Sequence, residues 1–402
     1  MPDPIHPTRS SNSTACHVCG GVRHRNLFRQ DFSGLSSGTF LHGYDVCVCE
    51  DCGFVFAGGL PPGEAFDRYY AEMSKWEHLD NAGLESAEDA QRFAETAQFV
   101  AQFKPDRQEP VLDVGCSTGG LLAALKRKGF TRLLGLDPSP QCAQLARKNY
   151  DLEVFTGSVQ TLNQLPEHFG LVTLSGVLEH LYDPNRVLQD VRNRLTEGGL
   201  LYVLVPDATR FAQYMDAPYQ QFSIEHILFF TPNSLENLLR RNGFVPLQVR
   251  PVANPCTLRY LYPGVESVFQ KGPAGAWTRD DSGERTLRDY FSASAAWERA
   301  IVQQINDLVQ RQEPILVWGV GTNTQRLMAT TRLREANITA FVDSNPHYHG
   351  KELEGRPIIS PQDVAKHAEP ILIASIIFRE EISQQIRNQL KLGNQLIMLS
   401  TG

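Results

Sequence analysis

Short apolar runs alternate with helix-like stretches through the middle of the chain. Four runs are short, apolar and bounded by Gly, Asp or Pro, as buried strands are: VLDVG at 111, LLGLD at 133, LVTLSGV at 171 and LLYVLVP at 200. Stretches of helical period lie between them, and a glycine pair ends the last one. Strands and helices in alternation predict a parallel, doubly wound α/β sheet.

A second strand–helix pattern begins at Pro314, with the strand-like runs ILVWGVG, ITAFVDSNP, EPILIAS and QLIML. Residues 251–313 hold Pro and Gly early and end in a helix-like run near Arg311. The start of the chain differs from both patterns, because it is rich in Cys, His, Gly and Ser and has little helical periodicity. We therefore expect three domains: residues 1–75, 76–250 and 251–402.

Composition narrows the class of protein. The chain has 402 residues, 42% hydrophobic and 21% charged, with a net charge of −7, which is typical of a soluble multidomain protein. It has no basic block to follow nucleic-acid phosphates and no apolar run of the ~20 residues that span a bilayer. Its first residues lack the apolar core of a secretory signal. We expect a cytoplasmic protein with neither a nucleic-acid nor a membrane partner, and no protein partner is evident.

Two CxxC pairs, Cys16–Cys19 and Cys49–Cys52, stand near the start of the chain, and a glycine follows each pair. Reducing conditions disfavour disulfides, and two such knuckles can supply four thiolates in a tetrahedron for Zn²⁺. Four thiolates leave no open position, so the predicted zinc is structural. Cys47 is out of phase with the pairs, and we interpret it as incidental. The nearby histidines are expected at the surface rather than as ligands: His17, His24 and His42.

The segment DVGCSTGG, residues 113–120, follows a strand and opens a helix, which exposes backbone N–H groups to a ligand. Gly115 permits the turn, and Gly119 allows a ligand to approach the backbone. Asp137 ends the next strand, 22 residues after Gly115, where an acid meets ribose hydroxyls. Asp113 would repel a pyrophosphate but suits the ammonium end of S-adenosylmethionine (SAM). The pattern predicts SAM; the alternative is a Rossmann-like turn without a ligand.

At these residues the chain resembles the class I SAM-dependent methyltransferases. The likeness continues in SGVLEH, residues 175–180, and in LTEGGLLYVLVPD, residues 195–207. It implies that Asp137 holds the ribose, and that five residues line the cofactor: Gly115, Cys116, Gly119, Ser175 and Val177. The adenine-side segment TGS, residues 156–158, departs from the family, which has an acid after the glycine. Ser158 can still hydrogen-bond the adenine amine, although less strongly than an acid.

The order of a four-cysteine knuckle, a class I methyltransferase core and a Rossmann-like C-terminal domain resembles the sugar C-methyltransferases. These act on nucleotide-linked keto-sugars, which the resemblance implies as the small-molecule acceptor. The family carries a Glu-His pair before an aromatic segment, matched here by Glu225-His226. The resemblance implies that His226 removes a proton beside a ketone, that Glu225 fixes its tautomer, and that His180 lines the same crevice. The alternative for His226 is a histidine that structures the loop.

Two departures leave the acceptor open. Ser223 stands where the family has a Tyr, and Asn254-Pro255-Cys256-Thr257 replaces an HGGS-type segment. Oxygen methylation of a polysaccharide or natural product is therefore an alternative to carbon methylation. A third hypothesis is a zinc-dependent scaffold whose methyltransferase core has lost turnover.

A second glycine turn, GVGTNT at residues 319–324, also follows a strand and opens a helix, and Asp343 ends the next strand. Thr324 stands where a dinucleotide fingerprint has its third glycine, so the match is incomplete. The resemblance implies that this domain cradles the acceptor's nucleotide. A bound dinucleotide and a turn without a ligand are the alternatives.

Overall fold

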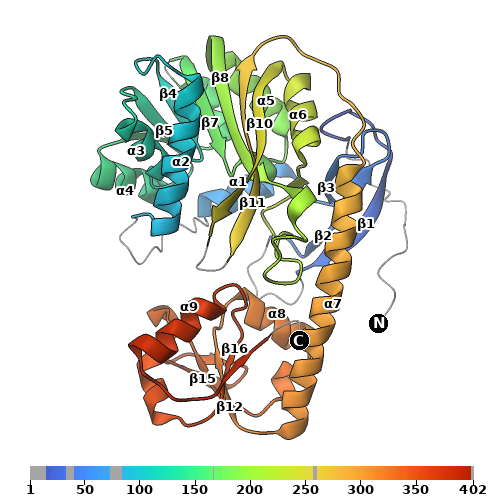
Figure 1. Ribbon diagram of the computed structural model, residues 1–402, viewed down its shortest axis with the longest axis vertical. Helices are drawn as coiled ribbons and strands as arrows, with labels where there is room; N and C mark the ends of the chain where they lie inside the picture. Colours follow the sequence, from blue (N-terminus) through green and yellow to red (C-terminus); the bar gives the residue numbers. More distant parts are fainter. Residues whose placement is uncertain (1–14, 33–39, 73–83, 166, 257–259, 400–402) are drawn as a thin grey trace.

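The computed structural model describes residues 15–32, 40–72, 84–165, 167–256 and 260–399, which form three sheets (Figure 1). A four-stranded sheet near the N-terminus lies beside a seven-stranded central sheet, and a six-stranded sheet forms a separate C-terminal layer. The two larger sheets carry helices, as the alternating pattern predicts. The architecture is an α/β fold with two Rossmann-like units and a small N-terminal cysteine-containing unit.

The N-terminal sheet is antiparallel, in the order β1-β2-β3-β9. Its strands are β1 (His24–Asp31), β2 (Gly43–Cys49), β3 (Val55–Gly58) and β9 (Leu228–Phe229). The last of these, β9, comes from far along the chain and follows most strands of the central sheet in the sequence. Helix α1 (Gly63–Glu72) follows β3. The N-terminal unit is therefore tied to the central unit by strand pairing.

The central sheet has the order β10-β11-β8-β7-β4-β5-β6, and the five strands from β8 to β6 are parallel. They are β4 (Val111–Val114), β5 (Leu133–Asp137), β6 (Glu153–Thr156), β7 (Phe169–Ser175) and β8 (Leu195–Pro206). The chain runs outward from β4 to β6 and then returns to β7 on the other side of β4. Ligands of open α/β sheets bind at the strand ends of such a switch point.

The helices of the central unit include α2 (Ala87–Phe103), α3 (Gly120–Arg127), α4 (Pro140–Tyr150), α5 (Pro184–Arg194) and α6 (Pro232–Arg241). Four of them begin at a side-chain cap: Ser86, Ser139, Asp183 and Thr231 accept hydrogen bonds from first-turn N–H groups of α2, α4, α5 and α6. Helix α3 begins at Gly119, which has no side chain to cap it. The strands and helices that the hydrophobic pattern predicts between residues 111 and 206 are all present.

Residues 251–255 and 261–271, which the sequence assigned to the third domain, lie in the central sheet. Strands β10 (Phe244–Pro255) and β11 (Leu261–Lys271) pair as an antiparallel hairpin, and β11 pairs with β8. Two of the prolines in this stretch, Pro251 and Pro255, lie on β10, the edge strand, where a missing N–H donor costs least. The C-terminal unit begins instead with α7 (Ser282–Arg311).

The C-terminal sheet has the order β14-β15-β13-β12-β16-β17, with only the β14–β15 pair antiparallel. Its strands are β12 (Ile315–Trp318), β13 (Ile338–Val342), β14 (Glu352–Leu353), β15 (Arg356–Ile359), β16 (Ile371–Ile373) and β17 (Leu396–Met398). Helices α8 (Thr322–Thr330) and α9 (Arg379–Gln384) belong to the same unit.

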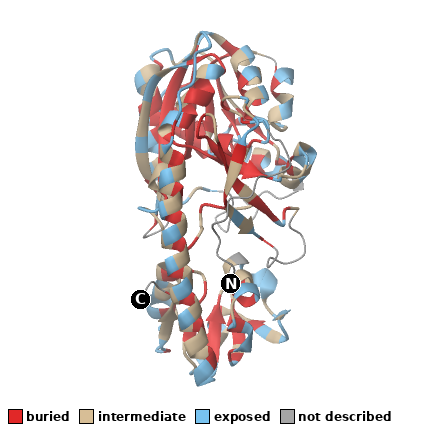
Figure 2. Cartoon of the chain, turned by 90° about the vertical axis from the view of Figure 1, so that its right-hand side faces the viewer, coloured by how far each residue is buried: buried red, intermediate tan, exposed pale blue. Residues whose placement is uncertain are grey.

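Helix α7 connects the two α/β units. Its 30 residues extend about 45 Å along one side of the molecule, from the central unit to the C-terminal unit (Figure 1). Leu287 and Tyr290 are buried in the central core, whereas Trp297, Ile301 and Ile305 are buried in the C-terminal core. Figure 2 shows buried and exposed residues alternating along the whole helix. One helix therefore contributes to two hydrophobic cores.

A buried ion pair also joins the units. The Nη2 atom of Arg379, at the start of α9, lies 2.7 Å from Oδ1 of Asp216, in the loop before β9. Both side chains are about one-tenth exposed, and Arg379 also donates to the backbone carbonyl of Asp216. The Arg379 guanidinium lies 6.0 Å from the Trp297 ring of α7. Removing Arg379 would take its positive charge away from a buried carboxylate.

We expect Arg379→Ala to lower the free energy of unfolding by about 3 kcal/mol, because breaking a buried pair leaves an uncompensated carboxylate. Lys366→Ala removes an exposed pair with Asp363 and serves as the control, with an expected loss below about 0.5 kcal/mol. Urea unfolding followed by tryptophan fluorescence measures both. Equal losses in the two variants would show that the buried pair does not hold the units together.

Candidate functional site

The glycine turn after β4 has the geometry that the sequence predicts. The Gly115 backbone has φ +70° and donates its N–H to the Leu136 carbonyl at 2.7 Å. A Cβ at position 115 would lie 2.7 Å from Cγ2 of Val177. Gly119, with φ +87°, is the N-cap of α3. Both the backbone conformation and the packing therefore require glycine at position 115.

Asp137, at the end of β5, closes this turn. Its carboxylate accepts the Ser117 N–H at 2.8 Å and the Ser139 N–H at 2.9 Å, and it is 8% exposed. Each carboxylate oxygen has two lone pairs, so these bonds are compatible with further donors such as ribose hydroxyls. The structure thus adds a backbone-organising role to the ribose contact that the sequence predicts for Asp137.

A pocket of about 200 Å³ opens at the carboxyl ends of β4 and β7. Four of the predicted cofactor residues line it: Asp113, Gly115, Cys116 and Ser175. The other four lie around it. Gly119 caps α3, Val177 packs on Gly115, Asp137 closes the turn, and the Ser158 hydroxyl accepts the Gln160 N–H at 3.2 Å. The pocket is at the switch point, where an open α/β sheet binds its ligand.

Asp113 and Cys116 both line this pocket but differ in their surroundings. Asp113 is buried and accepts a hydrogen bond from the Thr173 hydroxyl at 2.5 Å. Burial raises the pKa of its carboxyl to about 7, and a bound ammonium group would lower that pKa again. The Cys116 sulfur packs beneath Gly135, where a Cβ would lie 2.5 Å away, so this thiol belongs to the core between β4 and β5.

Helix α2 supplies pocket residues that the sequence analysis missed. Ser86, Asp89, Arg92 and Phe93 line the pocket, and Arg92 pairs with Asp89 at 2.6 Å. An arginine here suits the carboxylate of a methionine moiety, as Asp113 suits its ammonium group. The capping pattern Ser86-x-x-Asp89 before a helical run was the available signal for the start of this helix.

The predicted catalytic histidines lie together. His180 ends a single 3₁₀ turn, Leu178–His180, after β7, and His226 precedes β9. Their ring centroids are 4.9 Å apart, and Nδ1 of His180 lies 3.0 Å from the Glu225 carbonyl oxygen. One carboxylate oxygen of Glu179 and one ring nitrogen of each histidine lie within 4.8 Å of one another. The structure thus brings His180, Glu225 and His226 into one cluster.

Two tyrosines of α1 complete the cluster, and the sequence analysis missed both. The Tyr69 hydroxyl donates to Oε1 of Glu225 at 2.8 Å. The Tyr70 ring meets His180 edge-on at 6.1 Å, and the buried Tyr70 hydroxyl has no hydrogen-bond partner among the described residues. Burial raises the pKa of both hydroxyls, so they are donors at neutral pH. The consecutive tyrosines were the only signal in the sequence.

Ser223, which replaces a family tyrosine, organises the loop that carries the Glu-His pair. Its hydroxyl accepts the N–H groups of Glu225 at 3.3 Å and His226 at 3.1 Å. Its carbonyl accepts the Tyr44 hydroxyl of β2 at 3.0 Å. With serine at position 223 the loop is still held by hydrogen bonds, and the phenol groups near the Glu-His pair come from α1 instead. Asn254, in the second departure, is buried on β10, and Thr257 lies outside the described residues.

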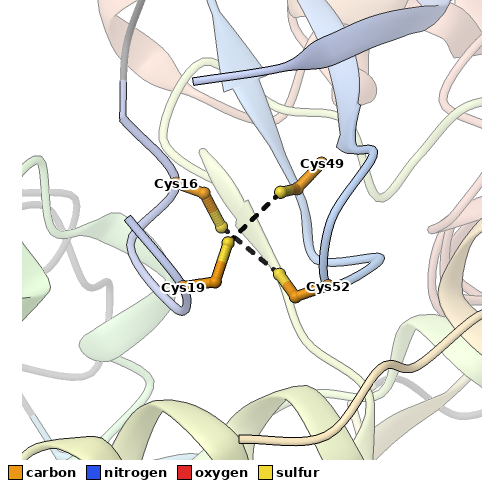
Figure 3. Close-up of side chains that lie close together, drawn as sticks. All are labelled: Cys16, Cys19, Cys49 and Cys52. Carbon is orange, nitrogen blue, oxygen red and sulfur yellow. Dashed lines mark hydrogen bonds between the residues drawn. The ribbon is translucent and has the colours of Figure 1, made fainter. Parts of the chain in front are cut away.

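The four predicted cysteines converge (Figure 3). The sulfurs of Cys16 and Cys52 are 3.5 Å apart, as are those of Cys19 and Cys49, and all four lie within 4.8 Å of one another as free thiols. Zn–S bonds of about 2.3 Å in a tetrahedron place sulfurs about 3.8 Å apart, so the donor set fits Zn²⁺. Cys47 is separate, and burial raises the pKa of its thiol to about 12.

Two of the histidines expected at the surface are not exposed. His17 and His24 meet Phe56 of β3 edge-on, with centroid distances of 6.1 and 5.7 Å. Burial lowers the pKa of His17 to about 4. These rings pack against an aromatic side chain of the small sheet, and neither histidine belongs to the group of possible metal ligands.

The second glycine turn repeats the backbone arrangement of the first. Asp343 accepts the N–H groups of Val320 at 2.9 Å and Asn345 at 2.8 Å, as Asp137 does for its own turn. Gly319 has φ +100°, and the buried Thr324 hydroxyl donates to the Gly319 carbonyl at 2.8 Å. Thr324, which breaks the dinucleotide pattern, therefore stabilises the turn internally.

Comparison with known proteins agrees with this geometry. The family described as Methyltransferase domain matches residues 88–249, and one described as C2185-like, N-terminal matches residues 311–398. A ubiquinone biosynthesis O-methyltransferase of Paracidovorax citrulli is 30% identical over 42% of this chain and 78% of its own length. The chain belongs to the SAM-dependent methyltransferases.

Two further matches are less similar in sequence. The human mitochondrial ubiquinone biosynthesis O-methyltransferase is 28% identical over 43% of this chain, which spans 54% of the human enzyme. The solved 1,6-didemethyltoxoflavin-N1-methyltransferase of Burkholderia thailandensis is 17% identical, with a TM-score of 0.42 over 56% of this chain and 98% of its own. Across the part of this methyltransferase that the structure describes, no helix has both the length and the hydropathy to cross a membrane.

We expect Gly115→Ala to weaken SAM binding at least tenfold, because an alanine at φ +70° also clashes with Val177 and displaces the turn. Gly129→Ala is the matched control. Gly129 has φ +89° but faces open space, so its replacement costs about 1 kcal/mol of stability and leaves SAM affinity within twofold. Calorimetric titration measures both affinities. Unchanged SAM binding in Gly115→Ala would contradict the placement of the cofactor on this turn.

Proposed function

We propose that this methyltransferase transfers the methyl group of SAM to a carbon beside the ketone of a nucleotide-linked sugar. The observation that carries the proposal is the cluster of His226, Glu225 and Tyr70 beside the cofactor pocket. Carbon methylation needs a base for a C–H proton and a donor for the oxygen of the resulting enolate. A histidine pair and a buried tyrosine hydroxyl without a hydrogen-bond partner among the described residues offer those two groups together.

The residues of the chain divide the work as follows. His226 takes the proton from the acceptor carbon, and its backbone is held by the Ser223 hydroxyl. Glu225 is anchored by Tyr69, so the Glu-His loop is braced against α1. Tyr70 donates to the enolate oxygen. SAM supplies an electrophilic methyl group with a good leaving group, and the pocket aligns it with the acceptor carbon.

The C-terminal unit is the candidate holder of the acceptor's nucleotide. Its glycine turn repeats the backbone organisation of the cofactor turn, with Asp343 in the place of Asp137. Arg379 and helix α7 hold this unit against the central unit. A nucleotide-linked acceptor would offer this unit a second group to bind, which a small phenol lacks.

Oxygen methylation is the second candidate, and one observation favours it. The relatives from Paracidovorax citrulli and human are both named as O-methyltransferases. A hydroxyl acceptor also needs a base, for which His226 would serve, but it forms no enolate. The unpartnered Tyr70 hydroxyl then has no assigned chemistry, which is why carbon methylation is our first proposal.

We expect His226→Ala to lower kcat at least 100-fold while SAM affinity stays within threefold, because general-base catalysis contributes about 10²–10⁴ in rate. His168→Ala, an exposed histidine of the same unit, is the control and should keep full activity. Both are assayed on 4-keto and reduced nucleotide sugars by mass spectrometry, with NMR of the product to locate the new methyl group. Full turnover in His226→Ala would refute the base, and a methyl ether product would replace carbon by oxygen methylation.

We also propose that Cys16, Cys19, Cys49 and Cys52 bind one structural Zn²⁺. Sulfur spacing, free thiols and the lack of an open position support this role. The metal would supplement the small hydrophobic core of the N-terminal sheet. A reducing, cytoplasmic setting, in which these thiols stay unpaired, is part of the proposal.

We expect purified protein to contain one equivalent of zinc and Cys49→Ser to lose it, with a lower melting temperature. Cys47→Ser is the matched control, because Cys47 is equally buried on the same strand but lies outside the cluster. Elemental analysis measures the zinc and calorimetry the stability. Less than about half an equivalent in the wild type, or equal zinc loss in both variants, would contradict the four-thiolate site.

A further inference from the structure

Glu179 is a buried carboxyl for which the proposed function has no use so far. It lies in the turn Leu178–His180, is 1% exposed, and its carbonyl accepts the Ile227 N–H at 3.0 Å. Its Oε2 atom has no hydrogen-bond partner among the described residues. Burying a carboxyl without a partner is costly. Because burial of this carboxyl beside the histidines costs free energy, we looked for a function that would account for it.

The carboxyl stands between the cofactor pocket and the histidine pair. Its Oε1 lies 3.8 Å from Nε2 of His180. The same atom lies 3.9 Å from the place a Cβ would take on Gly176, and Gly176 lines the cofactor pocket. One ring nitrogen of His226 is within 4.8 Å of a Glu179 oxygen. Glu179 is therefore close enough to interact electrostatically with a charge on either histidine.

Hydrogen bonding orients His180 toward this carboxyl. Nδ1 of His180 lies 3.0 Å from the Glu225 carbonyl oxygen, which can only accept, so Nδ1 carries a proton. The other ring nitrogen, Nε2, then faces Glu179. A proton on Nε2 makes His180 a cation beside a carboxylate, and a proton on Glu179 makes both groups neutral.

We propose that Glu179 is a positioning residue that acts as the counter-ion of the histidine pair. The inference rests on the proposed role of His226 as base. When the acceptor's C–H bond breaks, its electron pair stays with the acceptor and its proton forms an N–H bond on His226. The histidine pair, whose side chains are half-buried, gains one positive charge beside the buried Glu179. The ionised Glu179 stabilises that charge without forming a bond to substrate or cofactor.

The groups that face Glu179 come from four segments and support this assignment. Glu225 repels its negative charge, and Tyr70 and Tyr262 present neutral phenols whose pKa values its charge helps to raise. The two histidines are the groups that become cationic. Burial raises the pKa of Glu179 to about 8. The counter-ion is therefore lost as pH falls through about 8, unless an imidazolium beside it lowers that pKa.

The test measures the histidines directly. We expect Glu179→Gln, which keeps the side-chain shape, to lower the pKa of His226 by about one unit, because the negative charge that favours the imidazolium is gone. NMR titration of ¹³C-labelled histidine rings in the protein bound to S-adenosylhomocysteine gives these pKa values, with His180→Asn and His226→Asn to assign the signals. This measurement needs no acceptor, so it tests the role of Glu179 independently of whether the acceptor is a nucleotide-linked sugar.

Turnover provides the second readout. Glu179→Gln should lower kcat at least tenfold with little change in KM or SAM affinity, and Glu179→Asp should recover part of that loss. Glu266→Gln is the matched control: this glutamate is also buried, but Arg250 and Tyr202 bind it in the central sheet. We expect Glu266→Gln to lose stability and to keep the histidine pKa values and the pH–rate profile of the wild type.

Two results would overturn the proposal. One is a His226 pKa in Glu179→Gln that equals that of the wild type. The other is wild-type activity that a chelator abolishes and one added divalent cation restores, with the same cation shifting both histidine signals. That second result would make Glu179, His180 and His226 a metal site, since their ligand atoms are already within 4.8 Å.

Discussion

The pairing of β9 with β3 is the interaction on which the rest of the site depends. β9 has two residues, yet it attaches the N-terminal sheet to the chain that has just left the catalytic loop. The preceding residue, Ile227, donates its N–H to Glu179 and accepts the Ala57 N–H with its carbonyl. His226 is thus held between the N-terminal sheet and the turn that carries His180. Its position is set by backbone hydrogen bonds from two separate units.

The cysteine cluster stabilises this arrangement from a distance. Cys49 ends β2, which pairs with β3, and Tyr44 of β2 binds the Ser223 carbonyl in the loop before Glu225. A metal held by the four thiolates would keep β2 and β3 in register without touching the substrate. Through this chain of contacts, the proposed zinc would act on the shape of the loop that carries Glu225 and His226.

The sequence predicted best what local patterns determine. Four buried strands, the glycine turn, Asp137 and the cysteine knuckles all have short-range signals, and the structure contains each of them. Long-range contacts had no such signal. Strand β9 is too short to recognise, β10 and β11 carry prolines that obscure their strand pattern, and nothing in the sequence marks Glu179 as part of the site. Tyr69 and Tyr70 contact Glu225 and His180, which lie more than 100 residues away in the sequence, so only the folded chain brings them together.

Helix α7 has a consequence for the size of the acceptor. Because the helix is buried in both cores, its residues between Tyr290 and Trp297 set a fixed spacing between the two α/β units. Each residue in that stretch contributes about 1.5 Å and about 100° of rotation. If the C-terminal turn binds part of the acceptor, as we propose, this stretch sets how far apart that part and the methylated atom can be. Related chains with other acceptors could change that span by altering the length of this stretch, with the chemistry of either unit left intact.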